Sequence, residues 1–171
     1  MSTISASQVK ELREKTGLGL MDCKKALEEA NGDIDLAIEE LRKTSGIKAS
    51  KKSGRSAADG LIGITTKDKD FFMIEVNCET DFVARDDSYI NFTKETLDAY
   101  SNNPSQSLEE LLESGIEDNR EKLVQKLGEN IVVRRLAKSD DSSISGSYLH
   151  SNNKIGSVSY THLTLPTTVS V

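Results

Sequence analysis

An acidic residue and a large aromatic residue stand side by side where an apolar run ends and a helical pattern begins. The run Phe71 to Val76 predicts a strand, and the chain continues as Asn77-Cys78-Glu79-Thr80-Asp81-Phe82-Val83-Ala84-Arg85. Because Thr80 or Asp81 suits the N-cap of a following helix, the next side chains would project from the end of the sheet. Phe82 would contribute roughly 1.5–3 kcal/mol if a partner buried its ring. Asp81 would compete there for groups that hold a cation or a phosphate.

The same spacing also fits a purely structural role. In that interpretation Asp81 caps the helix and Phe82 packs into the core of its own molecule. The spacing alone leaves both interpretations open.

Other residues that could do chemistry are few. Cys23 and Cys78 lie far apart without Cys-x-x-Cys spacing, and the chain has two histidines, so we expect neither a metal site nor a disulfide. An enzyme with Cys78 as nucleophile and His150 as base would lack a third orienting group. No Gly-x-x-x-x-Gly-Lys-Ser/Thr motif is present, and we expect no bound nucleotide or other cofactor.

The composition excludes several classes of function. Hydrophobic residues make up 36% and charged residues 29% of the 171 residues, as is usual for a globular protein. The net charge is −6, and the acidic excess lies after residue 58, which is unfavourable for direct nucleic-acid binding. The sequence shows neither a bilayer-spanning apolar run nor the pattern of a signal peptide, so we expect a cytoplasmic protein without membrane contact.

Three helical patterns at the start of the chain predict a small helical module over residues 1–44. Ser5-x-x-Gln8 is a capping box, and Gly17 is placed to end the first helix. A second helix begins at Leu20 and closes at Asn31-Gly32, and Asp33 is the expected cap of the third. Residues 45–58 lose this periodicity and collect basic residues among Ser, Gly and Ala, which predicts a linker.

Alternating and helical patterns over residues 59–156 predict a second domain that contains a sheet and several helices. Residues 61–66 and 71–78 form an expected hairpin, and Gly128 is expected to end a helix. Residues 131–136 predict a further strand, and a second hairpin is expected across Asn152-Asn153. The predicted fold class is α+β. No charged residue follows Lys154, and we interpret residues 157–171 as a foreign tail, from adaptor sequence or a misjoined reading frame.

Several segments in the same order closely resemble the bacterial translation elongation factor Ts family. They extend from Ile4 to about Gly156 and include Met21-Asp22-Cys23-Lys24-Lys25-Ala26-Leu27, Asn31-Gly32-Asp33, Glu75-Val76-Asn77-Cys78, Thr80-Asp81-Phe82-Val83-Ala84, Gly128-Glu129-Asn130-Ile131 and Gly146-Ser147-Tyr148-Leu149-His150. The resemblance implies a three-helix module resembling ubiquitin-associated domains, followed by a two-part core. It also implies guanine-nucleotide exchange on elongation factor Tu, in its GDP-bound and nucleotide-free states, without covalent chemistry.

The resemblance implies particular roles for matching residues. Thr80, Asp81, Phe82 and Val83 would form the segment that enters elongation factor Tu near its Mg²⁺ and weakens the hold on GDP. Further partner contacts would come from Leu20, Met21, Lys24, Leu127, Gly128 and His150. Helix packing is the alternative for Met21 and Leu127, and a structural hydrogen bond is the alternative for His150.

The chain departs from the family pattern after its first core half. The second half, its projecting helical hairpin and the C-terminal helix do not appear in the sequence, so we expect weaker binding and reduced exchange. A different class of function is a protein-binding adaptor that uses the three-helix module alone. An adaptor would not require the acidic and aromatic pair Asp81-Phe82.

Overall fold

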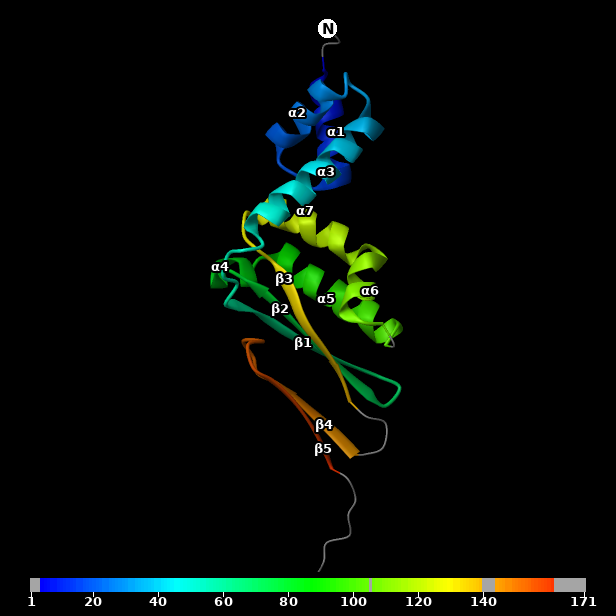
Figure 1. Ribbon diagram of the computed structural model, residues 1–171, viewed down its shortest axis with the longest axis vertical. Helices are drawn as coiled ribbons and strands as arrows, with labels where there is room; N and C mark the ends of the chain where they lie inside the picture. The colour runs from blue at the N-terminus through cyan, green and yellow to red at the C-terminus, as the bar shows by residue number, and fades with distance from the viewer. Residues whose placement is uncertain (1–3, 105, 140–143, 162–171) are drawn as a thin grey trace, which may run out of the picture.

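The computed structural model describes residues 4–104, 106–139 and 144–161, and it confirms the predicted α+β class. Figure 1 shows three helices at one end of an elongated molecule, a sheet covered by helices in the middle, and a β-hairpin at the other end. Within the described residues the strands form two separate sheets.

The first end of the molecule consists of α1 (Ala6–Thr16), α2 (Leu20–Glu29) and α3 (Ile34–Lys52). The predicted capping box is present, because Ser5 and Gln8 exchange side-chain to backbone hydrogen bonds. Gly17 ends α1 at φ 69°, a left-handed conformation that favours glycine, and Asp33 caps α3. Their shared core is formed by Val9, Leu12, Leu18, Cys23, Ala26, Leu27, Ala30, Ala37 and Leu41.

The third helix continues into the segment whose composition predicts a linker. Residues 45–52 are helical, and only residues 53–58 connect α3 to the first strand. Ser45 and Ala49, which are four positions apart, are buried where α3 packs on α7 (Glu117–Leu127). Small side chains at this spacing allow two helices to approach closely. Of the three lysines in residues 45–52, Lys51 is exposed, whereas Lys48 lies 3.1 Å from Asp22 and Lys52 donates to the Val124 carbonyl of α7 at 3.5 Å.

The middle of the molecule is an antiparallel sheet in the order β1-β2-β3. Its strands are β1 (Asp59–Lys67), β2 (Asp70–Cys78) and β3 (Val132–Lys138), so the predicted hairpin and the predicted third strand are confirmed. The helix α5 (Asp87–Asn102) packs on β1 and β2. The short helix α6 (Leu108–Leu111) and a π-helical turn, η1 (Leu112–Ile116), lead into α7.

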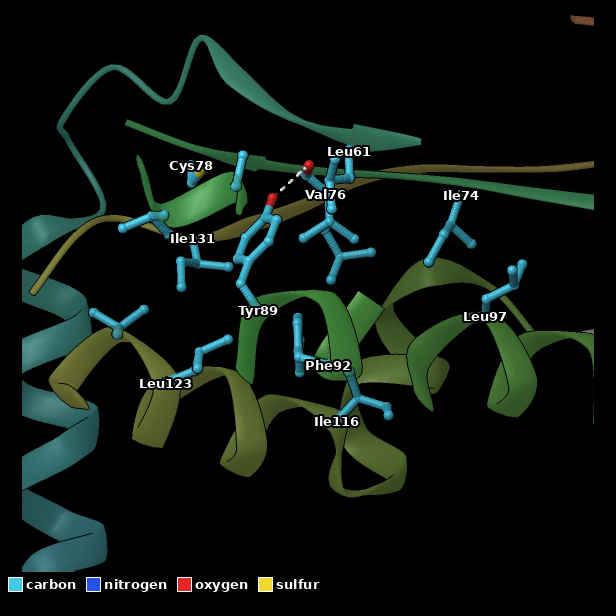
Figure 2. Packing of buried hydrophobic residues seen from close by; sticks show 14 of the residues in the cluster. Leu61, Ile74, Val76, Cys78, Tyr89, Phe92, Leu97, Ile116, Leu123 and Ile131 are labelled. Atoms are coloured by element: carbon cyan, nitrogen blue, oxygen red, sulfur yellow. Dashed lines mark hydrogen bonds between the residues drawn. The ribbon is translucent and has the colours of Figure 1, made fainter. Parts of the chain in front are cut away.

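A buried tyrosine connects the helices to the sheet. Figure 2 shows Tyr89 of α5 reaching from the helical layer to β2, where its hydroxyl donates a 2.7 Å hydrogen bond to the carbonyl of Val76. The register of β2 against β3 shifts between Glu75 and Val76, so this bond serves a carbonyl at an irregular point of the sheet. Burial raises the pKa of the Tyr89 hydroxyl, which therefore remains a donor.

The last described elements are β4 (Ile144–Leu149) and β5 (Gly156–Thr161), which confirm the predicted second hairpin. Its turn is attached to the first sheet, because Asn153 accepts a 2.7 Å hydrogen bond from the Ile62 amide and Lys154 pairs with Asp59 at 2.7 Å. Residues 157–161 of the segment expected to be foreign belong to β5. Residues 162–171 lie outside the described residues.

Replacing Tyr89 with phenylalanine removes one hydroxyl and leaves the Val76 carbonyl without this donor. We expect Tyr89→Phe to lower the free energy of unfolding by about 1–3 kcal/mol, as measured by urea denaturation. Tyr148→Phe, at an exposed position of β4, is the control and should change it by less than about 0.5 kcal/mol. Equal stability of the two variants would contradict a structural role for this bond.

Candidate functional site

The helix that carries the acidic and aromatic pair has a single turn. It is α4 (Asp81–Ala84), directly after β2, and Thr80 is its N-cap, with a hydroxyl that accepts from the Val83 amide at 3.5 Å. Val83 and Ala84 are buried in the main core. Val83 and Ala84 thereby fix one side of the turn to the core, and the side chain of Phe82 points away from the core.

Phe82 is 81% exposed. The structural alternative, in which this ring packs into its own core, therefore does not describe this fold. Asp81 does not cap the helix either, because Thr80 does so, and the Asp81 carboxylate pairs with Arg85 at 2.8 Å on the surface. The pair is presented to solvent as the first interpretation requires, while its role in a partner stays a prediction.

A glutamate from another part of the chain holds the start of α4. The carboxylate of Glu129 accepts hydrogen bonds from the amides of Glu79 and Thr80 at 3.0 Å each, and from the Thr80 hydroxyl at 2.6 Å. The residue follows Gly128 at the end of α7, about fifty positions along the chain. Local patterns in the sequence did not indicate it, although its segment was among those that resemble the family.

The partner contacts predicted in the three-helix module lie on α2 and not on α4. Leu20 and Met21 begin α2 and are 52% and 72% exposed, so helix packing does not account for Met21. Lys24 is also exposed and lies 3.8 Å from Glu28. Figure 1 shows α2 and α4 on the same side of the molecule, separated along its length by the region where α3 meets α7. One partner surface would therefore have to span both elements.

The remaining candidates lie at the ends of secondary-structure elements. Leu127 is partly buried against the main core, which supports its packing alternative, and Gly128 ends α7 at φ 82° as predicted. His150 follows β4, and its Nδ1 lies 3.0 Å from Asn152 Oδ1. A cavity of about 570 Å³ lies between α4 and the turn of the β4–β5 hairpin, with Asp81 and Asn152 in its lining. The structure thus brings the hairpin turn beside α4.

Cys78 is buried directly beneath the exposed turn. Its thiol donates to the Thr80 carbonyl at 3.2 Å, and burial raises its pKa to about 11. Since the thiolate is the nucleophile, this environment is unfavourable for nucleophilic catalysis. Among the described residues, no group of His, Cys, Asp and Glu side chains is arranged to hold a metal ion, and no helix is both long and apolar enough to cross a bilayer.

Sequence comparison identifies proteins that this chain resembles. The family model for elongation factor Ts matches residues 79–167. The chain is 52% identical over 160 residues to elongation factor Ts of Marinobacter nauticus, an alignment that covers 92% of this chain and 55% of that protein. It is 53% identical over 157 residues to the Hahella chejuensis protein, covering 91% and 54%, and 51% identical over 150 residues to the Salmonella agona protein, covering 88% and 52%.

The alignment with the Marinobacter nauticus protein covers 92% of the chain and so includes most of the three-helix module and of the sheet with its helices. The chain belongs to the elongation factor Ts family. It spans about half the length of the curated relatives it matches. The family match extends to residue 167, into the segment interpreted as foreign, and the origin of that segment stays a prediction.

The environment of Cys78 predicts slow alkylation in the folded protein. In a Cys23→Ala variant, which retains one thiol, iodoacetamide should react at neutral pH at least about 100-fold more slowly than after denaturation. Because the pKa is raised, the thiol is protonated at neutral pH and the rate should increase as the pH rises toward 11. Mass spectrometry measures the extent of alkylation. An alkylation rate in the folded protein close to that of the denatured chain would contradict the buried, protonated state of Cys78.

Proposed function

We propose that this chain is a guanine-nucleotide exchange factor of translation elongation that acts on elongation factor Tu in the cytoplasm. In this proposal Asp81 and Phe82, positioned by Thr80 and Val83, enter the partner near its Mg²⁺. GDP then leaves and GTP replaces it. The observation that carries the proposal is the exposed Phe82 ring on a turn anchored to the core, in a chain of the elongation factor Ts family.

The physical argument is one of coupled binding and needs no covalent step. If this protein lowers the affinity of elongation factor Tu for GDP by some factor, GDP must lower the affinity for this protein by the same factor. Bound Mg²⁺ supplies a large local positive charge that offsets the negative charge of the GDP phosphates. Disturbing its coordination would therefore speed GDP release.

The other candidate residues would extend the contact surface. Leu20, Met21 and Lys24 would contact the partner from α2, and Leu127, Gly128 and His150 from the core. Leu20 and Met21 are exposed, and their helix α2 lies on the same side of the molecule as α4 (Figure 1), which supports this arrangement.

That exposure also supports the second candidate, an adaptor that binds through the three-helix module alone. An adaptor would bind equally well without the Phe82 ring. The effect of changing Phe82 therefore separates the two functions.

Removing the exposed ring should impair exchange and spare the fold. We expect Phe82→Ala to slow the stimulated release of a fluorescent GDP from elongation factor Tu by about tenfold or more in stopped-flow experiments, because the partner would lose a buried aromatic ring. The matched control is Ile47→Ala, since Ile47 is 57% exposed on α3 and lies outside the proposed contacts. Equal release with both variants would refute the proposed role of Phe82.

The proposal also predicts how affinity depends on length and on nucleotide. The 171 residues by themselves should bind elongation factor Tu at least about tenfold more weakly than the Marinobacter nauticus relative, because that protein has almost twice the length and more surface for contact. Nucleotide-free elongation factor Tu should bind more tightly than the GDP-loaded form. Isothermal titration calorimetry measures both differences. Equal affinity of the long and short proteins, or no preference for the nucleotide-free state, would contradict the proposal.

A further inference from the structure

We propose that Glu129 is a positioning residue that fixes the direction in which Asp81 and Phe82 leave the molecule. Its carboxylate accepts three hydrogen bonds from the two residues that precede α4. The inference rests on the proposed function for its biological purpose, but the geometric part can be tested separately.

The helix α4 cannot fix its own direction. It contains four residues, far fewer than an isolated helix needs to be stable in water. Val83 and Ala84 hold its far end in the core, but the N-terminal end faces solvent at Thr80. Hydrogen bonds to a charged acceptor are stronger than neutral ones. The Glu129 carboxylate therefore restrains the exposed end with three hydrogen bonds, alongside the weaker bond from the Cys78 thiol to the Thr80 carbonyl.

The anchor is itself held on the rest of the protein. Gly128 adopts φ 82°, and this left-handed conformation turns the chain sharply at the end of α7, so that Glu129 reaches α4. The next residue contributes as well, because the backbone amide of Asn130 donates to the Glu79 carboxylate at 2.6 Å. The Glu79 and Glu129 side chains thus each accept from the other segment's backbone.

A second set of contacts connects this turn to the end of α3. The buried Asn130 side chain donates from Nδ2 to the carbonyls of Ser53 and Arg55, at 3.3 and 2.8 Å. Arg55 in turn lies 3.5 Å from the Glu79 carboxylate. These contacts consequently fix the position of α4 relative to the segment that follows the three-helix module.

Geometry and charge make different predictions for a glutamine at this position. In Glu129→Gln the amide oxygen can accept from the Glu79 and Thr80 amides, and the amide nitrogen can donate to the Thr80 hydroxyl, which has acceptor capacity. A positioning role is therefore rescued by glutamine and lost with alanine. A role that depends on the negative charge would be lost in both variants.

Amide hydrogen exchange in the full 171-residue chain tests the geometric claim without the partner. In Glu129→Ala the amides of Glu79 and Thr80 should exchange at least about tenfold faster than in the wild type, whereas Glu129→Gln should stay within about threefold. Glu95→Ala, at an exposed glutamate of α5, is the control and should leave both amides unchanged. Wild-type exchange in Glu129→Ala, or equal loss of protection in the glutamine variant, would overturn the proposal.

A double-mutant cycle tests whether this positioning serves nucleotide release. Glu129→Ala should slow stimulated GDP release by about tenfold in the wild-type background but by less than about twofold when Phe82 is already alanine, because the effect acts through the ring. Full additivity of the two changes would overturn the claim that Glu129 acts through Phe82. If Phe82→Ala alone has no effect, the proposed function fails, while the amide exchange still decides whether Glu129 holds the turn.

Discussion

The exposed pair depends on one constraint: a single helical turn cannot hold itself in place. A four-residue helix makes too few internal hydrogen bonds to offset the entropy of ordering its backbone. Its order must therefore come from neighbours, and here these are the core beneath Val83 and Ala84 and the carboxylate of Glu129. Glu129 lies about fifty positions along the chain, and the core combines residues of β1, β2 and β3 with the helices, so the exposed turn depends on assembly of this core.

The second constraint is the continuous helix that joins the two parts of the molecule. A flexible tether would leave α2 free to move relative to α4, whereas α3 runs through to Lys52 and packs on α7. Polar contacts also fix this junction: Asp22 of α2 accepts from Lys48 and from Gln125, each at 3.1 Å. These hydrogen bonds lower the pKa of the Asp22 carboxyl although its partial burial acts in the opposite direction. The two exposed elements are thereby held at a set separation along one side of the molecule.

The elements that sequence patterns predicted well are those defined by local chemistry. The Ser5 capping box, the glycine ends of α1 and α7 and the alternating strands depend on residues within a few positions of one another. The features that sequence patterns did not predict depend on contacts with residues distant in the sequence. Residues 45–52 resemble a linker until α7 covers Ser45 and Ala49, and Glu129 is an ordinary surface residue until the end of β2 lies beside it. The exposure of Phe82 also required the fold, because the spacing alone left a buried ring open.

The β4–β5 hairpin shows how the same dependence on neighbours extends to the other end. Two strands alone are marginally stable in water, so the hairpin relies on its attachment to β1 through Asn153 and Lys154. The Lys154 ammonium holds the pKa of the Asp59 carboxyl below its usual range, which is expected for an ion pair formed in the folded state. This attachment places the hairpin turn against the cavity beside Asp81. Contacts between β1 and the hairpin thus determine where His150 lies relative to α4. A partner surface that includes both His150 and α4 therefore depends on these contacts with β1.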